Sequence, residues 1–394
     1  MELIDVKLNE KDCCICLCER IDSSNASRVE EEINAFLDGL AEKPKKLLLD
    51  GDKTEYISSA GIRVVLRLLK KVKGLELVNA SQEVYEVLDM TGMTEIMPVS
   101  RAFRKISIEG CELIGRGSNG KVYRIDPETV VKVYKDPDSL PDIKRERELA
   151  RTAFILGIPT AIPYDIVKAG ESYGSVFELV NAKTMADLIR EEPGRLEELI
   201  ELSVQILKKI HETVPKEGTL PDMKKTAASW AEYTGALLSP EKGEKLAALI
   251  DALPERRTML HGDYHVKNIM LQGDEALLID MDTISTGHPV LEFASIFNAY
   301  KGFDTIARRK ESAFLGLSLD RSDFIYRRTL ELYFGTEDES FIRAVDEKAQ
   351  LVGYTRLLRR SSRRLGQTEE GKAQIEVARQ RLEELLERVD SLDF

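Results

Sequence analysis

The pattern of apolar residues changes near Ser107, and this change constrains the fold of the chain more than any other feature. Residues 1–104 alternate short strand-like runs with helix-like runs, whereas residues 105–182 hold mainly strand-like runs and residues 183–394 mainly helical ones. With 394 residues, the chain is too long for one compact domain. We therefore expect an α/β domain at 1–104, followed by an α+β domain with a β-rich lobe at 105–182 and a helical lobe at 183–394.

The first domain is expected to contain a partly parallel sheet covered by helices, because apolar strands follow helices after short connections. Its predicted strands are Met1–Leu8, Cys13–Cys18, Lys46–Asp50, Leu75–Asn79 and Ile96–Val99. Its predicted helices are Ser27–Leu40, Ile62–Val72 and Gln82–Met90.

The second domain is expected to begin with successive antiparallel strands joined by tight turns. The predicted strands are Glu112–Ile114, Val122–Ile125 and Val130–Tyr134, then Tyr164–Lys168 and Ser175–Leu179. A predicted helix, Ile143–Leu156, separates the first three strands from the last two.

Four of the five cysteines lie in one short stretch, as Cys13, Cys14, Cys16 and Cys18. The last three alternate with apolar residues, which is the period of a strand, and cysteine behaves there as a small buried hydrophobe. A zinc or redox site is the alternative, but no second CxxC pair and no histidine cluster follows. We interpret the stretch as a core strand.

The charge balance excludes one class of function. The chain has 57 Lys and Arg against 69 Asp and Glu, a formal charge of −12, which disfavours sequence-independent binding of nucleic acid. No apolar run approaches the roughly 18 residues typical of a membrane span. The first residues also lack the features of a signal peptide. We expect a cytoplasmic protein.

A glycine-rich turn, Gly115-Arg-Gly-Ser-Asn-Gly120-Lys-Val122, lies between two predicted strands. The same spacing occurs in dinucleotide-binding folds, but there it opens a helix, whereas a strand follows here. Glycines on a hairpin let the backbone fold closely over nucleotide phosphates. The residues predicted to contact the nucleotide in this turn are Gly115, Gly117, Ser118, Gly120 and Val122.

Twelve residues after Gly120, a single lysine, Lys132, interrupts an apolar strand. An ammonium group in apolar surroundings needs anionic partners, which nucleotide phosphates and a carboxylate of the next helix would supply. Glu146 and Glu148 are both candidates for that carboxylate. We prefer Glu146, because it borders the apolar stripe of its helix.

The segment Leu260–Met270 contains His-Gly-Asp followed by an asparagine, and Asp280 ends an apolar strand twelve residues later. Phosphoryl transfer needs a carboxylate beside the attacking hydroxyl and oxygen ligands for Mg²⁺ on the phosphates. Asp263 is the predicted base or hydroxyl-positioning residue. Asn268 and Asp280 are the predicted metal ligands.

Residues 107–394 resemble the aminoglycoside phosphotransferase and choline kinase group, which is related to protein kinases. The resemblance rests on HGDxxxxN with a downstream IDxD, on the GxPxP-like turn at 157–163 and on the LxxxH ending at His211. His288 and Glu292 stand where this group usually has aspartates. The resemblance implies a bilobal protein-kinase-like fold with ATP and Mg²⁺ as cofactors, and adenine lying against a linker that includes Glu178 and Val180.

Residues 1–105 resemble STAS domains, the anti-sigma-factor antagonist family. The resemblance rests on the strand-to-helix turn Tyr56-Ile-Ser-Ser-Ala-Gly61 and on the segment Leu77–Gly92. In that family a serine before the glycine is phosphorylated and controls partner binding. The match places this serine at Ser59, although the aspartate that usually precedes it is Ser58 here.

Two helical features lie outside these resemblances. Five arginines, the first of them Arg356, occur within nine residues. We interpret them as a solvated helix face, with binding of an acidic substrate or of the STAS domain as the alternative. Residues 373–389 have the spacing of an amphipathic helix.

The leading hypothesis is an ATP- and Mg²⁺-dependent phosphotransferase for an unknown hydroxyl-bearing acceptor, regulated by or acting through its STAS domain and a protein partner. The alternative is a nucleotide-sensing binding switch with little catalysis. Aminoglycoside modification, as in antibiotic resistance, is a third hypothesis. The resemblance suggests it, but similarity of fold does not establish the acceptor.

Overall fold

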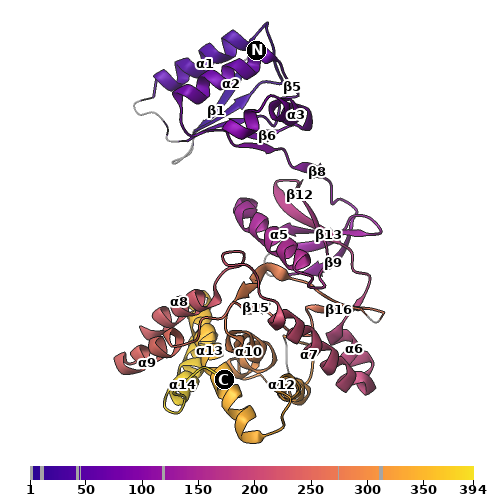
Figure 1. The fold of residues 1–394 in the computed structure, drawn as a ribbon, viewed down its shortest axis with the longest axis vertical. Coiled ribbons are helices and arrows are strands. Elements are labelled where there is room, and N and C mark those ends of the chain that lie inside the picture. Colours follow the sequence, from indigo (N-terminus) through magenta and orange to yellow (C-terminus); the bar gives the residue numbers. More distant parts are fainter. Residues whose placement is uncertain are drawn as a thin grey trace. The chain divides into compact units, whose positions relative to one another are not determined.

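The computed structural model describes residues 3–8, 13–40, 44, 46–117, 120–273, 275–309 and 314–394, with backbone only for residues 7 and 8. The chain forms two compact units, Met1–Ile106 and Ser107–Phe394, each with its own core, and Figure 1 labels their helices and strands. Each unit is described separately below.

The first unit is built on a five-stranded sheet of order β1-β2-β4-β6-β7. Strands β1 and β2 are antiparallel, and the other neighbouring pairs are parallel. The strands of this unit are β1 (Ile4–Leu8), β2 (Cys13–Leu17), β3 (Arg20–Ile21), β4 (Leu47–Asp50), β5 (Tyr56–Ile57), β6 (Leu75–Ala80), β7 (Val99–Arg101) and β8 (Arg104–Ile106). The expected partly parallel sheet is therefore present.

Helices cover this sheet, and their apolar faces form the core with it. Helices α1 (Ala26–Asp38) and α2 (Ser59–Lys71) bury Val29, Ile33, Val65 and Leu68 against strand residues such as Leu49. The remaining helices are α3 (Gln82–Met90) and α4 (Met93–Ile96).

The prediction of a strand at Ile96–Val99 is wrong in its placement. Ile96 ends helix α4 and is 55% exposed, and strand β7 begins only at Val99. Pro98 has no N–H to donate to the sheet, although its carbonyl accepts a hydrogen bond from Leu77.

The interpretation of the cysteine stretch as a core strand is confirmed, since four of the five residues of β2 are buried. Strand β2 forms as predicted, and its core-facing residues are Cys13, Ile15 and Leu17. Because side chains alternate along a strand, Cys14 and Cys16 lie on the opposite face of the sheet.

The second unit begins with the antiparallel strands β12-β13-β11-β10-β9, on which helix α5 (Leu140–Ile155) packs. The strands are β9 (Glu112–Arg116), β10 (Gly120–Arg124), β11 (Thr129–Tyr134), β12 (Pro163–Ala169) and β13 (Ser172–Glu178). These elements agree closely with the predicted ones.

A mainly helical part follows. Its helices are α6 (Met185–Glu191), α7 (Leu196–Glu212), α8 (Met223–Gly235), α9 (Pro240–Asp251), α10 (Pro289–Phe297), α11 (Phe303–Ile306), α12 (Leu319–Phe334), α13 (Glu339–Leu365) and α14 (Glu369–Leu386). Its short strands are β14 (Lys183–Thr184), β15 (Met259–Leu260), β16 (Ile269–Gln272), β17 (Glu275–Leu278) and β18 (Ser285–Thr286).

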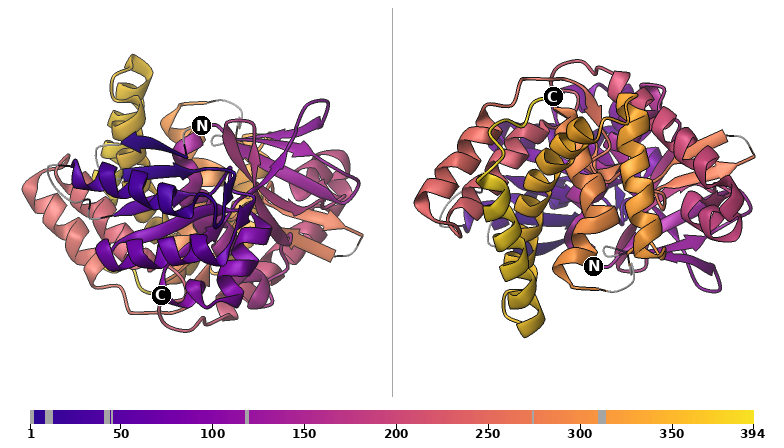
Figure 2. Two further views of the ribbon diagram at one scale, coloured as in Figure 1. Left: turned by 90° about the horizontal axis from the view of Figure 1, so that it is seen from above. Right: turned by 90° about the horizontal axis from the view of Figure 1, so that it is seen from below.

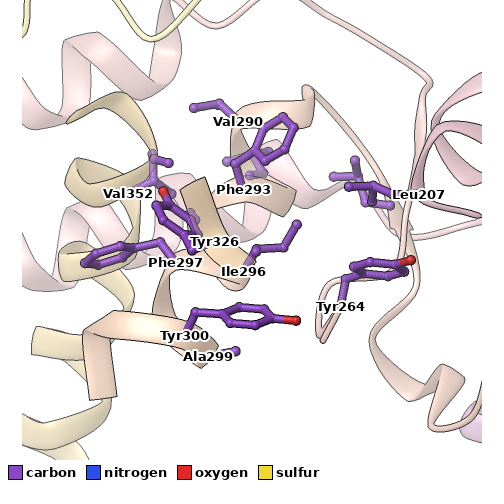
Figure 3. Packing of buried hydrophobic residues seen from close by; sticks show 14 of the residues in the cluster. Leu207, Tyr264, Val290, Phe293, Ile296, Phe297, Ala299, Tyr300, Tyr326 and Val352 are labelled. Carbon is purple, nitrogen blue, oxygen red and sulfur yellow. The ribbon is translucent and has the colours of Figure 1, made fainter. Parts of the chain in front are cut away.

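Helix α10 lies at the centre of this part and is buried along its whole length. Phe293 and Phe297 pack there with Leu207, Tyr326 and Val352 from other helices (Figure 3). Helix α13 packs against α10 on one side and against the amphipathic helix α14 on the other (Figure 2). No helix in the described ranges has the length and apolar character needed to cross a membrane.

Candidate active site

The glycine-rich turn joins β9 to β10 and forms one wall of a cavity. The Gly117 N–H donates to the Gly120 carbonyl at 2.9 Å, which closes the turn. A Cβ at Gly120 would collide with the Val133 carbonyl oxygen, so only glycine fits there. Ser118, a predicted nucleotide contact, lies outside the described residues.

Lys132 forms an ion pair with Glu146, at 2.7 Å between Nζ and Oε1. The Tyr134 hydroxyl donates to the other Glu146 oxygen at 2.5 Å, so both oxygens of this buried carboxylate are engaged. Glu148 is largely exposed and lies 4.0 Å from Arg151. Glu146 is thus the helix carboxylate that contacts the strand lysine.

Lys132 also lies 3.4 Å from Asp280 Oδ1. Burial opposes the charge of Lys132, but the carboxylates of Asp280 and Glu146 outweigh it and hold the pKa of the lysine above its usual range. The ammonium group therefore remains charged and available to a phosphate.

The loop that carries Asp263 is fixed through its backbone. Glu292, on α10 and fully buried, accepts the N–H groups of His261 and Gly262 at 2.5 and 3.0 Å. Gly262 has a φ of +80°, and a Cβ there would lie 2.5 Å from the Thr283 carbonyl oxygen. Ser295 Oγ donates to the Gly262 carbonyl at 2.7 Å. These contacts leave the loop little freedom just before Asp263.

The Asp263 carboxylate is partly exposed, and His265 Nε2 lies 3.6 Å from its Oδ2. Burial raises the pKa of Asp263, but the interaction with His265 and the charge of Arg356 outweigh it, so that this pKa lies below its ordinary value. Asp263 is therefore ionised near neutral pH, as a proton acceptor must be.

Asn268 and Asp280 line the cavity, and Asn268 is hydrogen-bonded to the backbone of Asp263. Asn268 Nδ2 donates to the Asp263 carbonyl at 3.0 Å, which leaves its Oδ1 available as a ligand. The Ile279 N–H donates to the Asn268 carbonyl, and this bond draws the two segments together. Asp280 has a φ of +63°, an uncommon conformation for a residue other than glycine.

A third carboxyl group, Asp282, adds negative charge to the lining of this cavity. Burial, together with the charges of Asp280 and Glu146, raises the pKa of Asp282 to about 7. Carboxylate and amide oxygens are the donors that Mg²⁺ prefers, and a divalent cation would offset their mutual repulsion. The residues present therefore fit a magnesium ion.

These groups surround one cavity of about 420 Å³. The predicted nucleotide contacts Gly115, Gly117, Gly120, Val122, Lys132, Glu178 and Val180 line it, together with Asn268 and Asp280. The Glu178 carboxylate accepts the Ile162 N–H at 3.3 Å, so its side chain is bound to the protein, and the linker faces the cavity mainly with apolar groups.

A second cavity, of about 630 Å³, shares Glu146 and Asp282 with the first. Trp230 and Arg356 line it, with the Arg356 guanidinium carbon 5.4 Å from the Trp230 ring centre. Arg356 Nη1 also contacts the Gly262 carbonyl and Ser295 Oγ, each at 3.2 Å. The interpretation of the arginine run as a solvated face is therefore wrong for Arg356, which packs against the loop that carries Asp263.

Sequence reasoning missed several of these residues. The sequence could have indicated Asp282 as a site residue, since it lies two residues after Asp280. Nothing in the sequence around Tyr134 or Trp230 indicates that these residues line the site. Glu292 was recognised only as a departure from the usual aspartate, but its longer side chain reaches both backbone N–H groups.

In the first unit, the predicted serine turn leads into α2. Ser58 is the N-cap residue, and its Oγ accepts the Ala60 N–H at 3.2 Å. Ser59 is the first residue of the helix and is exposed. A Cβ at Gly61 would lie 2.7 Å from Ile57 and 2.8 Å from Ile21, so the glycine allows close packing at this turn.

A strand lysine paired with a helix glutamate, under a glycine hairpin and opposite an Asp–Asn–Asp set, defines a kinase-type phosphotransferase. Sequence comparison agrees, since residues 110–331 match the phosphotransferase enzyme family, APH. The chain belongs to this family. Residues 4–106 match the STAS domain.

Among curated proteins, the first unit is similar to BtrV of Bordetella bronchiseptica, named a "putative anti-sigma factor antagonist". The two are 36% identical over 91 residues, which are 22% of this chain and 76% of BtrV. The N-terminal unit is thus an anti-sigma-factor-antagonist type of STAS domain.

Solved structures similar to this chain include two APH complexes and a choline/ethanolamine kinase family protein. The streptomycin–ATP complex of APH(2")-IIa is 15% identical, with a TM-score of 0.45 over 80% of this chain and 99% of that one. The GDP and kanamycin complex of APH(2")-IIIa is 13% identical, with a TM-score of 0.49 over 76% and 98%. A choline/ethanolamine kinase family protein of Mesorhizobium loti is 15% identical, with a TM-score of 0.46 over 70% and 88%.

Proposed function

We propose that this phosphotransferase uses ATP and Mg²⁺ to phosphorylate a hydroxyl group. The observation that carries the proposal is that Lys132, Asn268 and Asp280 line one cavity below the glycine hairpin. Asp263 is joined to this group through the hydrogen bond from Asn268 to its carbonyl.

The proposed roles follow from chemistry and position. Lys132, held by Glu146, binds nucleotide phosphate oxygens, while Asn268 Oδ1 and the Asp280 carboxylate hold magnesium, which neutralises charge on the phosphates. Asp263 orients the acceptor hydroxyl and accepts its proton. The acceptor oxygen then bonds to the γ-phosphorus as the bond to the β-phosphate oxygen breaks, and ADP leaves.

We place the acceptor in the second cavity, because it adjoins the nucleotide cavity and its wall includes Gly262 next to Asp263. Three cationic side chains line it beside four carboxyl groups: Lys135, Arg145 and Arg356, and Asp136, Asp142, Glu146 and Asp282. The three cationic side chains would repel a polycation, which a purely acidic lining would attract. We therefore favour a neutral or zwitterionic hydroxyl compound over an aminoglycoside.

We further propose that the STAS domain binds a regulatory protein and that Ser59 is its phosphorylation site, in a cytoplasmic setting where ATP is available. Ser59 is exposed at the first position of α2, where a phosphate would meet free N–H groups and a favourable helix dipole. The similarity of this domain to BtrV supports this proposal.

The test is incubation of the full chain with labelled ATP and magnesium, followed by separation of protein-bound label from small-molecule label. Wild-type protein should turn over ATP, and the Asp263→Asn variant should lose this activity. Full activity of Asp263→Asn would refute the mechanism. Tight magnesium–ATP binding without transfer to any acceptor would instead support the nucleotide-sensing switch.

Mass spectrometry of the same samples tests Ser59. Label on the wild-type protein should disappear in Ser59→Ala and persist in Ser58→Ala, the matched neighbour. If Ser59 stays unmodified in a protein that transfers phosphate elsewhere, the proposed phosphorylation of Ser59 is wrong. The STAS domain would then act as a docking module.

A further inference from the structure

Three side chains that commonly bind metal ions meet on the STAS sheet, on the face turned away from its core. They are Cys14 and Cys16 of β2 and Asp50, the last residue of β4. One ligand atom of each, the two Sγ atoms and a carboxylate oxygen, lies within 4.8 Å of the others. No part of the phosphotransferase site involves these residues.

The topology of the sheet produces this grouping. Cys14 and Cys16 are two positions apart on one strand, so their side chains point to the same face. Strands β2 and β4 are parallel neighbours, and their register places Cys16 directly beside Asp50. The next cysteine, Cys18, is engaged elsewhere, since its Sγ donates to the Arg20 carbonyl at 3.2 Å.

Hydrogen bonds orient the Asp50 carboxylate through both of its oxygens. Oδ1 accepts both the Asn79 side-chain amide and the Asp52 N–H, each at 3.0 Å. Oδ2 accepts from Cys16 Sγ, 3.9 Å away. Supporting hydrogen bonds of this kind orient the carboxylate ligands of metal sites.

Asn79 occupies an unusual backbone position. Its φ is +57°, and the β6–β7 register shifts between Leu77 and Ala80. Asparagine and aspartate adopt this left-handed region more often than other residues that carry a side chain. From this position the Asn79 amide donates to Asp50 Oδ1.

We propose that Cys14, Cys16 and Asp50 bind one zinc ion, with water completing a tetrahedral shell. Two thiolates and a carboxylate suit a borderline-soft divalent cation such as zinc, whereas magnesium prefers oxygen ligands alone. Cys14 and Asp50 are half-exposed, so solvent can reach the remaining position. Binding releases the thiol protons, because thiolates are the ligands.

The test uses the full chain, reduced and freed of metal by a chelator, with Co²⁺ as a spectroscopic probe. Excess magnesium is present so that it competes for the oxygen ligands of the phosphotransferase site. We expect an intense thiolate-to-cobalt charge-transfer band that saturates at one equivalent and disappears when zinc is added. Asn79→Gly, which tolerates the same φ, should weaken zinc binding by about 10–100-fold and keep the band.

Cys14→Ser and Cys16→Ser should each reduce the charge-transfer intensity, and the double variant should abolish it. Cys111→Ser, in the other unit, is the matched control and should bind as wild type does. A wild-type protein without the band, or a double variant that retains it, would overturn the proposal. So would a reduced protein that binds no zinc and forms only a Cys14–Cys16 disulfide on oxidation.

Discussion

Replacing Glu292 with glutamine should destabilise the helical part and slow catalysis together. The carboxylate is fully buried and accepts two backbone N–H groups, one from His261 and one from Gly262. Glutamine keeps the shape but offers one acceptor oxygen, and its NH₂ group would face the second N–H. The variant thus loses a charge-assisted hydrogen bond and leaves a buried donor unsatisfied.

A hydrogen bond to a charged group contributes about 1.5–3 kcal/mol, and an unsatisfied buried donor costs about 1–3 kcal/mol. We therefore expect the free energy of unfolding of Glu292→Gln to fall by about 3–5 kcal/mol. The corresponding Tm of the phosphotransferase unit should fall by roughly 10 °C.

Asp263 directly follows the two residues that Glu292 holds, and a displacement of about 1 Å in an active site can reduce a rate about 100-fold. We expect a loss of that order in kcat for ATP turnover, with KM for ATP little changed, because Glu292 does not line the nucleotide cavity. Calorimetry and steady-state kinetics measure both effects. Glu376→Gln, which breaks an exposed ion pair with Arg379, is the control and should change neither.

An unchanged Tm together with unchanged kcat in Glu292→Gln would refute the view that this carboxylate holds the loop. A reduced kcat at unchanged Tm would retain its positioning role but contradict the stability estimate.

Two further predictions concern other parts of the phosphotransferase unit. Glu146→Gln should lower kcat/KM for ATP at least 10-fold, because it weakens the ion pair that positions Lys132. Glu148→Gln is the control and should leave kcat/KM unchanged. Equal effects of the two variants in steady-state kinetics would contradict the pairing of Lys132 with Glu146. Burial holds the pKa of His288 below its ordinary value of 6.5, despite its hydrogen bond to Asp393. The Nδ1 atom of the neutral ring accepts the Val290 N–H, which a protonated ring could not do. The unfolded state therefore binds the proton first, so Tm should fall as pH drops below about 6.5, and His288→Asn should flatten this dependence.

The sequence was sufficient to predict most of the fold because its signals are local. The glycine turn, the apolar strands around Lys132 and the periodic helices each determine their element without help from distant residues. The segment Ile96–Val99 is apolar like the other predicted strands, so its composition suggested a strand. Pro98 has no N–H to donate to the sheet, and strand β7 begins only after it, at Val99.

The site was only partly predictable, because its remaining residues are defined by contacts across the fold. Arg356 belongs to a run that looks solvated, yet the packing of α13 against α10 turns this one arginine toward Gly262. The strand of the cysteine stretch was predicted correctly, but the metal-binding arrangement of its side chains was not. Alternation identified the strand correctly, but only the sheet shows which of the two faces is buried and that Asp50 lies beside Cys16.

The short connection between the two units bears on how Ser59 would be phosphorylated. The STAS match ends at residue 106 and the phosphotransferase match begins at residue 110, so few residues join the two. A short tether gives a high effective concentration only where geometry permits contact, and otherwise almost none. Transfer within one chain would proceed at a rate independent of protein concentration, whereas transfer between two chains would speed up with concentration. A tether too short to bring Ser59 to Asp263 of the same chain therefore favours transfer between two chains. Mixing the Asp263→Asn variant with the Ser59→Ala variant distinguishes transfer between chains from transfer within one chain. Label would reach Ser59 of the catalytically inactive chain only if one chain phosphorylates another.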